Sequence, residues 1–232
     1  MKLKPVRDPV RIYRGVRGKV ADLAGKRSYG AESQNELRAL RILVACSGAD
    51  IILEQPFSLE YMQSGKWRRY TPDVLLAKDG QCTAVEIKPD DVAQRPETQG
   101  FFGLVGGLLK QYGLHFRVWR QSEISKEPRL TNAAFLLNYR RHLPSPLERE
   151  RLRRAITSHE TGTLTTLSSL AEVRLESVLR VVLEGTLQIN WWQLLDHQSK
   201  VSRLPIGPQI WPAGQLHTSV YTCAESERNQ TQ

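Results

Sequence analysis

Two acidic residues stand at a spacing that could support metal-dependent chemistry. The stretch YTPDVLLAKDGQCTAVEIKPD holds an Asp-Gly pair, typical of a tight hairpin turn, between two extended runs. A turn that pairs Lys78 with Gln81 also sets Asp73 opposite Glu86. Facing side chains lie about 4.5–5.5 Å apart at Cβ, so like charges there destabilise the sheet. Some neighbouring group must offset this repulsion.

A divalent cation between the carboxylates would turn repulsion into ligation, because hard ions such as Mg2+ prefer carboxylate and carbonyl oxygens. Strand alternation puts Lys88 on the same face as Glu86, whereas Val85 and Ile87 point to the other, buried side. An alternative is a structural ion pair between Lys88 and one carboxylate. That pair would leave the second carboxylate unexplained.

Five segments carry a resemblance to a known family. They are Glu36 on a helix, then EQPFSLEY, GKWRRYTPD, VEIKP and FRVWRQSEI. The pattern of Pro72-Asp73 followed by Glu86-Ile87-Lys88 matches the PD-(D/E)xK nuclease motif. In this order the segments, from Ser28 to Ile124, resemble TnsA, the endonuclease subunit of heteromeric bacterial cut-and-paste transposases.

The resemblance implies the role of each site residue. Asp73 and Glu86 fall on the metal-binding acidic pair, Lys88 on the catalytic lysine and Glu36 on the helix carboxylate. Glu32 lies one turn before Glu36, and the spacing of the helix favours Glu36. The implied metal is Mg2+, with Mn2+ able to replace it, and its implied ligands are Asp73, Glu86, the Ile87 carbonyl and Glu36. Alternatively, Glu36 is a solvated residue that pairs with neighbouring arginines.

The elements that must position these residues follow from periodicity. Apolar residues at helical spacing predict a helix in GAESQNELRALRILVAC, and extended runs follow in IILEQPFSLEYM and KWRRY. After the hairpin, FFGLVGGLLKQYG predicts a helix and HFRVW a strand. We therefore expect an α/β fold: a restriction-endonuclease-like core with a mixed sheet flanked by helices.

A change in composition divides the chain. RHLPSPLERE suggests a boundary, and three helical runs followed by a strand pair outline a small winged-helix-like α+β domain, or equally a generic helical bundle. Trp191 and Trp192 are expected in its core. The expected divisions are a basic arm over 1–27, a catalytic domain over 28–140, a winged-helix-like domain over 141–205 and a flexible tail over 206–232.

Positive charge is concentrated at the N-terminus. The net charge is +9, and residues 1–30 hold nine Lys or Arg against two Asp, so this segment contributes +7 and leaves +2 for the rest. Such an arm commonly lies along a polyanion, or it serves as a solvated leader. A second basic group with an aromatic residue stands just before Asp73. The expected DNA-contacting residues are Arg14, Arg17, Lys19, Lys66, Trp67, Arg68 and Arg69, although a solvated strand face would explain the last four.

Other features exclude some classes of protein. The run FFGLVGGLL is far shorter than the ~20 residues that span a bilayer, and the N-terminus has no apolar secretory region. No association with a membrane is therefore expected. Three widely separated cysteines predict neither a disulfide framework nor a zinc site, so a reducing cytoplasm is expected, and the resemblance implies a bacterial one. The five histidines show no metal-ligand spacing.

The function implied is a metal-dependent DNA endonuclease that hydrolyses one strand, the strand not joined to target, at transposon ends. The implied partners are transposon-end DNA, a DDE transposase subunit (TnsB-like) and an AAA+ regulator (TnsC-like). A stand-alone restriction-type or junction-resolving nuclease would share the four site residues but would cut without partners. A non-catalytic DNA-binding adaptor predicts loss of an acidic ligand or the lysine, and all are present.

Overall fold

A four-stranded mixed sheet forms the centre of the protein. The computed structural model describes residues 2–5, 18–21, 28–46, 48–158, 161–204 and 206. The sheet has the strand order β4-β7-β8-β9, with β4 at Ile51–Glu54, β7 at Val74–Lys78, β8 at Gln81–Lys88 and β9 at His115–Arg120. The pair β8 and β9 is parallel, and the other neighbours are antiparallel. The mixed sheet expected from the sequence is therefore confirmed.

The hairpin of β7 and β8 has the predicted register. Lys78 faces Gln81 and Val74 faces Val85, so the ladder ends one position before Asp73 and Glu86. Asp79 and Gly80 in the turn both have positive φ, 51° and 75°. This is the backbone that an Asp-Gly turn between twisted antiparallel strands requires.

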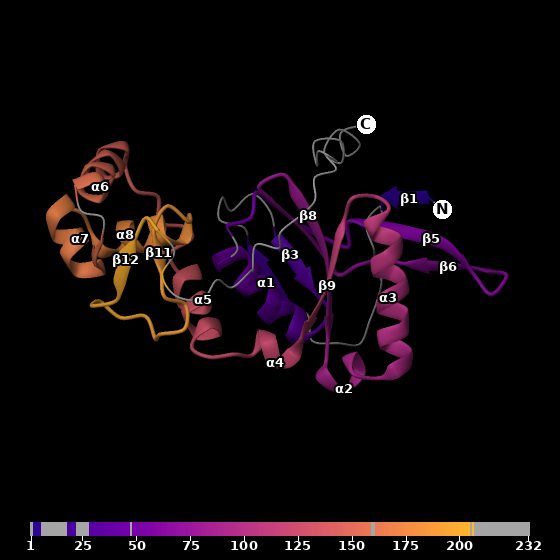
Figure 1. Ribbon diagram of the computed structural model, residues 1–232. Coiled ribbons are helices and arrows are strands. Elements are labelled where there is room, and N and C mark those ends of the chain that lie inside the picture. Colours follow the sequence, from indigo (N-terminus) through magenta and orange to yellow (C-terminus); the bar gives the residue numbers. More distant parts are fainter. Residues whose placement is uncertain are drawn as a thin grey trace.

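Helices cover both faces of the sheet (Figure 1). One face, with Val74, Leu76, Val85 and Ile87, shares a core with α1 (Gln34–Cys46) and α5 (Arg129–Leu137). The other face packs with α3 (Pro96–Lys110) and with a second sheet. Successive side chains of β7 and β8 thus enter two different cores, which explains the consecutive apolar residues of β7 and of Ala84 and Val85 in β8.

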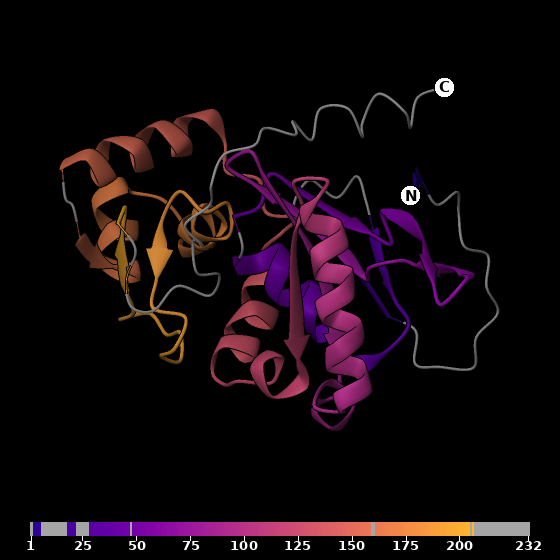
Figure 2. The ribbon, with the colours of Figure 1, turned by 45° about the vertical axis from the view of Figure 1, so that its right-hand side comes forward.

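The second sheet has the order β1-β5-β6, with β1 at Lys2–Pro5, β5 at Phe57–Gln63 and β6 at Lys66–Tyr70. The β5–β6 hairpin projects beyond α3 in both views (Figures 1 and 2). Two further strands, β2 (Gly18–Ala21) and β3 (Ser28–Ala31), pair antiparallel with each other. The described parts of the basic N-terminal segment are therefore strands β1 and β2, each paired with a strand of residues 28–140.

The chain after residue 140 builds a separate lobe (Figure 1). Its elements are, in order, α6 (Pro146–Ser158), β10 (Thr161–Thr163), α7 (Leu164–Ala171), α8 (Leu175–Leu183), β11 (Gln188–Ile189) and β12 (Lys200–Ser202). The three strands form an antiparallel sheet in the order β10-β12-β11. The short helices α2 (Asp90–Ala93) and α4 (Gln121–Ile124) belong to the part of the chain before residue 140.

The burial of helix α8 in the C-terminal lobe does not fit the role that a winged helix gives to its third helix. In a winged helix the third helix, here α8, would read DNA, yet every residue from 177 to 183 is buried. Its residues belong to the same apolar cluster as α1 and the central sheet. Since a recognition helix needs an exposed face, α8 reads no DNA in this arrangement. Trp191 is buried, as expected.

Within the described residues, no helix is both long and apolar enough to cross a bilayer. The expected tail from residue 206 lies almost wholly outside the described residues, and the predicted domain divisions stay predictions.

Candidate active site

Asp73 and Glu86 lie at the end of the β7–β8 ladder, on the face of the sheet that packs toward α3. Asp73 directly precedes β7, and Glu86 stands two positions after Ala84, which is buried on that face. Glu86 is itself buried, with 5% of its surface exposed. The apolar strands therefore carry two carboxylates into a partly desolvated place, where charge interactions are stronger than in water.

Two side chains hold the buried carboxylate of Glu86. The Tyr70 hydroxyl donates a hydrogen bond of 2.6 Å to Oε2, and Lys88 Nζ lies 2.6 Å from Oε1. A buried carboxylate is costly unless it is paired and hydrogen-bonded, and here each oxygen has a partner. Burial, first, and then the Glu86 charge raise the pKa of Tyr70 well above its ordinary value, so Tyr70 stays a donor.

Asp73 has a weaker set of partners. Its Oδ2 accepts a 2.7 Å hydrogen bond from the Ile87 N–H. Burial raises the pKa of Asp73 to about 7, the charge of Glu86 adds to the increase, and Lys88 and the Ile87 N–H oppose it. The repulsion predicted from the register is thus one cause of the raised pKa of Asp73.

Lys88 provides the positive charge of the site. Burial alone would lower its pKa, but the charges of Glu86, Asp73 and Glu36 outweigh burial and leave the pKa raised. Lys88 is therefore a permanent cation near neutral pH. The structural ion pair considered as an alternative does exist between Lys88 and Glu86, and it leaves Asp73 without an ion pair among the described residues.

Glu36 stands near the pair but is bound to the start of its own helix. Its Oε1 accepts from the Ser33 hydroxyl at 2.8 Å and its Oε2 from the Glu32 N–H at 2.8 Å, while Ser33 Oγ accepts from the Glu36 N–H. The Ser33 and Glu36 side chains thus accept from backbone N–H groups at the start of α1. The Glu36 charge nevertheless acts on both Asp73 and Lys88. Glu36 therefore borders the site while it caps the start of its own helix.

The donor atoms at the site suit a hard divalent cation. Asp73 offers Oδ1, which accepts no hydrogen bond from the described residues, and Glu86 offers a second carboxylate. Since the N–H of Ile87 points toward Asp73, its carbonyl faces the same side of the strand. Among the described residues no three His, Cys, Asp or Glu side chains are grouped to hold a metal. A metal here would therefore complete its shell with carbonyl, water or phosphate oxygens, as Mg2+ commonly does.

The expected DNA-contacting residues of β6 divide between the two faces of the hairpin. Trp67 is 64% exposed and faces Met62, and Arg69 shares that side. Lys66 and Arg68 alternate to the side of Tyr70, the side of the carboxylates. Lys19 is exposed on β2, whereas Arg14 and Arg17 lie outside the described residues.

One comparison decides the family of the region that holds this site. Residues 51–121 match the family model of the TnsA-like endonuclease N-terminal domain. This region is a TnsA-like endonuclease domain. The TnsA-like match includes the carboxylate pair, the lysine and the basic hairpin, and it begins after Glu36. No curated protein matches the chain.

Tyr70 is the functional candidate that sequence reasoning missed. It stands three residues before Asp73 in YTPD, at the buried end of a strand whose other residues are exposed. The alternation of KWRRY puts Tyr70 on the same face of β6 as Lys66 and Arg68. Only the packing of β6 against the central sheet brings its hydroxyl to Glu86.

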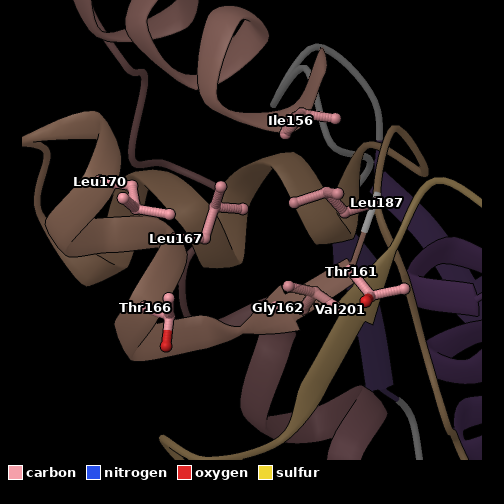
Figure 3. Close-up of a pocket in the computed structure, with 8 residues that line it drawn as sticks. All are labelled: Ile156, Thr161, Gly162, Thr166, Leu167, Leu170, Leu187 and Val201. Carbon is pink, nitrogen blue, oxygen red and sulfur yellow. The ribbon is translucent and has the colours of Figure 1, made fainter. Parts of the chain in front are cut away.

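A small pocket in the C-terminal lobe carries no comparable chemistry (Figure 3). Leu167 and Leu170 of α7, Ile156 of α6 and Val201 of β12 line most of it, and none of its lining side chains titrates. It is an apolar gap between α6, α7 and the small sheet rather than a catalytic site.

Proposed function

We propose that this protein is a Mg2+-dependent DNA endonuclease of a Tn7-type transposition complex. It hydrolyses one strand, the strand not joined to target, at each transposon end. The observation that carries the proposal is the pairing of Asp73 with Glu86 beside Lys88 inside the TnsA-like region. Together they provide two hard anionic ligands and a cation that can face a phosphate.

The residues divide the chemistry between them. Asp73, Glu86 and the Ile87 carbonyl would hold Mg2+, with Glu36 completing the site directly or through water. The metal supplies a bound water of lowered pKa and charge neutralisation at the scissile phosphate. Lys88 orients the attacking water or stabilises the charge that develops on the phosphate oxygens. Mn2+ would use the same ligands in place of Mg2+.

The rest of the molecule supports binding of DNA and partners. The C-terminal lobe has the order helix, strand, helix, helix, strand, strand, and its first strand pairs with its last. We assign this lobe to the winged-helix type, with the buried α8 excluded as its DNA-reading element. A TnsB-like transposase and a TnsC-like regulator are the proposed protein partners.

The decisive experiment is nicking of a labelled transposon-end DNA with the partner transposase present. The native protein is compared with Asp73→Ala and Lys88→Ala, and Asp91→Ala, an exposed acidic residue of α2, is the control. We expect Mg2+-dependent cleavage of one strand by the native protein and the control. Both site variants should bind DNA but cleave at least about 100-fold more slowly, since each removes a transition-state contact.

Two results would contradict the proposal. Cleavage by both site variants at the native rate would place the active site elsewhere. Efficient cutting without any partner would favour a stand-alone nuclease instead.

A further inference from the structure

Tyr70 connects the basic hairpin to the carboxylate site. It is the last residue of β6, the strand that carries Lys66 and Arg68, and 6% of its surface is exposed. Its hydroxyl donates to Glu86 Oε2 at 2.6 Å, while Lys88 holds the other oxygen of that carboxylate. Glu86 is therefore fixed from two directions, by its own strand and by a strand of the other sheet.

The ring of Tyr70 is itself held in place. Phe101 of α3 meets it edge-on at 5.6 Å between ring centroids, and Phe116 of β9 meets it edge-on at 6.2 Å. Such edge-to-face contacts favour one ring orientation. The hydroxyl thus has little freedom, and the Glu86 carboxylate inherits the same orientation.

We propose that Tyr70 is a positioning residue of the nuclease site, which orients Glu86 for metal binding and ties that carboxylate to the DNA-contacting strand. The inference rests on the proposed function. A group that hydrogen-bonds a metal ligand fixes its direction, and its loss typically costs 10–100-fold in metal affinity or activity. Tyr70 would act through its hydrogen bond to Glu86.

The test replaces the hydroxyl and keeps the ring. Tyr70→Phe retains both aromatic contacts, and Tyr61→Phe is the matched control, because Tyr61 is a buried tyrosine of the neighbouring strand β5. In the complex with the transposase, we expect Tyr70→Phe to lower kcat for end nicking about 10–100-fold. Its KM for DNA should stay within about twofold of native, since the basic side chains are untouched. The half-saturating Mg2+ concentration should rise, which a loss of packing alone would not cause.

A second measurement does not depend on activity. The shift in melting temperature produced by Mg2+ or Mn2+ reports metal affinity of each folded variant. We expect Tyr70→Phe to need about 10–100-fold more metal than native for the same shift, and Tyr61→Phe to match native.

The outcomes separate the two proposals. If native protein cuts and Tyr70→Phe shows the native kcat and metal dependence, the positioning role is wrong and the nuclease stands. If the native protein neither cuts nor responds to metal, the proposed function fails and the role of Tyr70 fails with it. A Tyr70→Phe variant with a raised KM and native metal affinity would mean that Tyr70 shapes the hairpin instead of the site.

Discussion

At the scale of single residues, Asp73 and Glu86 differ in the number of groups that bind their carboxylates. Glu86 has a lysine and a tyrosine hydroxyl on its oxygens, whereas Asp73 has one backbone N–H. The pKa of Asp73 is consequently raised to about 7 by burial and by Glu86. A bound cation would reduce the repulsion between the two carboxylates.

Titration of Asp73 should make the stability of the metal-free protein depend on pH. The pKa of Asp73 is about 7 when folded and about 3.9 when unfolded, so the folded state holds the proton more tightly. Stability should therefore fall as pH rises from about 4 to about 7 and change no further through this group. Asp73→Asn removes this loss, and its stability relative to native should grow over that window by at most about 4 kcal/mol.

Thermal melts in a chelator at pH 4, 6 and 8 provide the measurement. Asp79→Asn, in the exposed turn of the same hairpin, is the control and should follow native. Added Mg2+ should raise the melting temperature of the native protein at pH 8 and leave Asp73→Asn unchanged. A constant difference between Asp73→Asn and native at all three pH values would contradict the raised pKa.

At the scale of elements, the β5–β6 hairpin determines on which face each basic residue of β6 lies. Successive side chains of β6 point to opposite faces. Lys66 and Arg68 therefore share the face of Tyr70, toward the carboxylates, and Trp67 and Arg69 lie on the other face. Arg69 also donates to Ser58 Oγ at 2.8 Å, which ties it to its own sheet. The four residues predicted as one DNA-contacting group therefore cannot all approach one stretch of backbone from the same side.

Salt dependence tests the carboxylate-side pair. For duplex DNA, each lost phosphate contact reduces the slope of log Kobs against log salt by about 0.9. We expect this change for Lys66→Ala and for Arg68→Ala. Lys110→Ala is the control, because Lys110 lies away from the carboxylate site. It ends α3, shortly before His115 of β9, and His115 pairs with Thr83, at the opposite end of β8 from Lys88. Equal slopes for all three variants and native would remove Lys66 and Arg68 from the DNA interface.

At the scale of the whole molecule, helix α5 joins the two lobes. The Asn132 amide donates to the carbonyls of Trp191 and Gln193 at 3.2 and 2.8 Å, and its oxygen accepts from the Leu195 N–H at 2.9 Å. Nearby, the Arg129 guanidinium lies 5.6 Å from the Trp119 ring centroid and 5.0 Å from that of Trp192. One apolar cluster also runs from the central sheet into α6, α7 and α8.

Loss of the Asn132 contacts should weaken this junction. Asn132 is 1% exposed, so Asn132→Ala leaves buried carbonyl and N–H groups without their partner. We expect the free energy of unfolding to fall by about 3 kcal/mol in urea titrations. Asn138→Ala, an exposed asparagine at the end of the same helix, should change it by less than about 0.5 kcal/mol. Native-like unfolding of Asn132→Ala would mean that the lobes are held by apolar contacts alone.

Local rules gave the hairpin without help from the rest of the chain. Asp79-Gly80 fixed the turn, the turn fixed the register, and the register placed Asp73 opposite Glu86. Alternation then put Lys88 beside Glu86. These features depend on neighbours in one hairpin, so short-range pattern was enough to predict them.

Tertiary packing decided what the sequence left open. The glycines of α3 invite a close-packing interpretation, yet an added Cβ would meet nothing at Gly103 and Gly107, and only Gly106 lies against Phe116. The burial of α8 and the contact from Tyr70 to Glu86 depend on packing between different elements of the chain. Periodicity shows which side of a strand or helix is apolar. It does not show which distant element covers that side, because that choice depends on the packing of the whole chain.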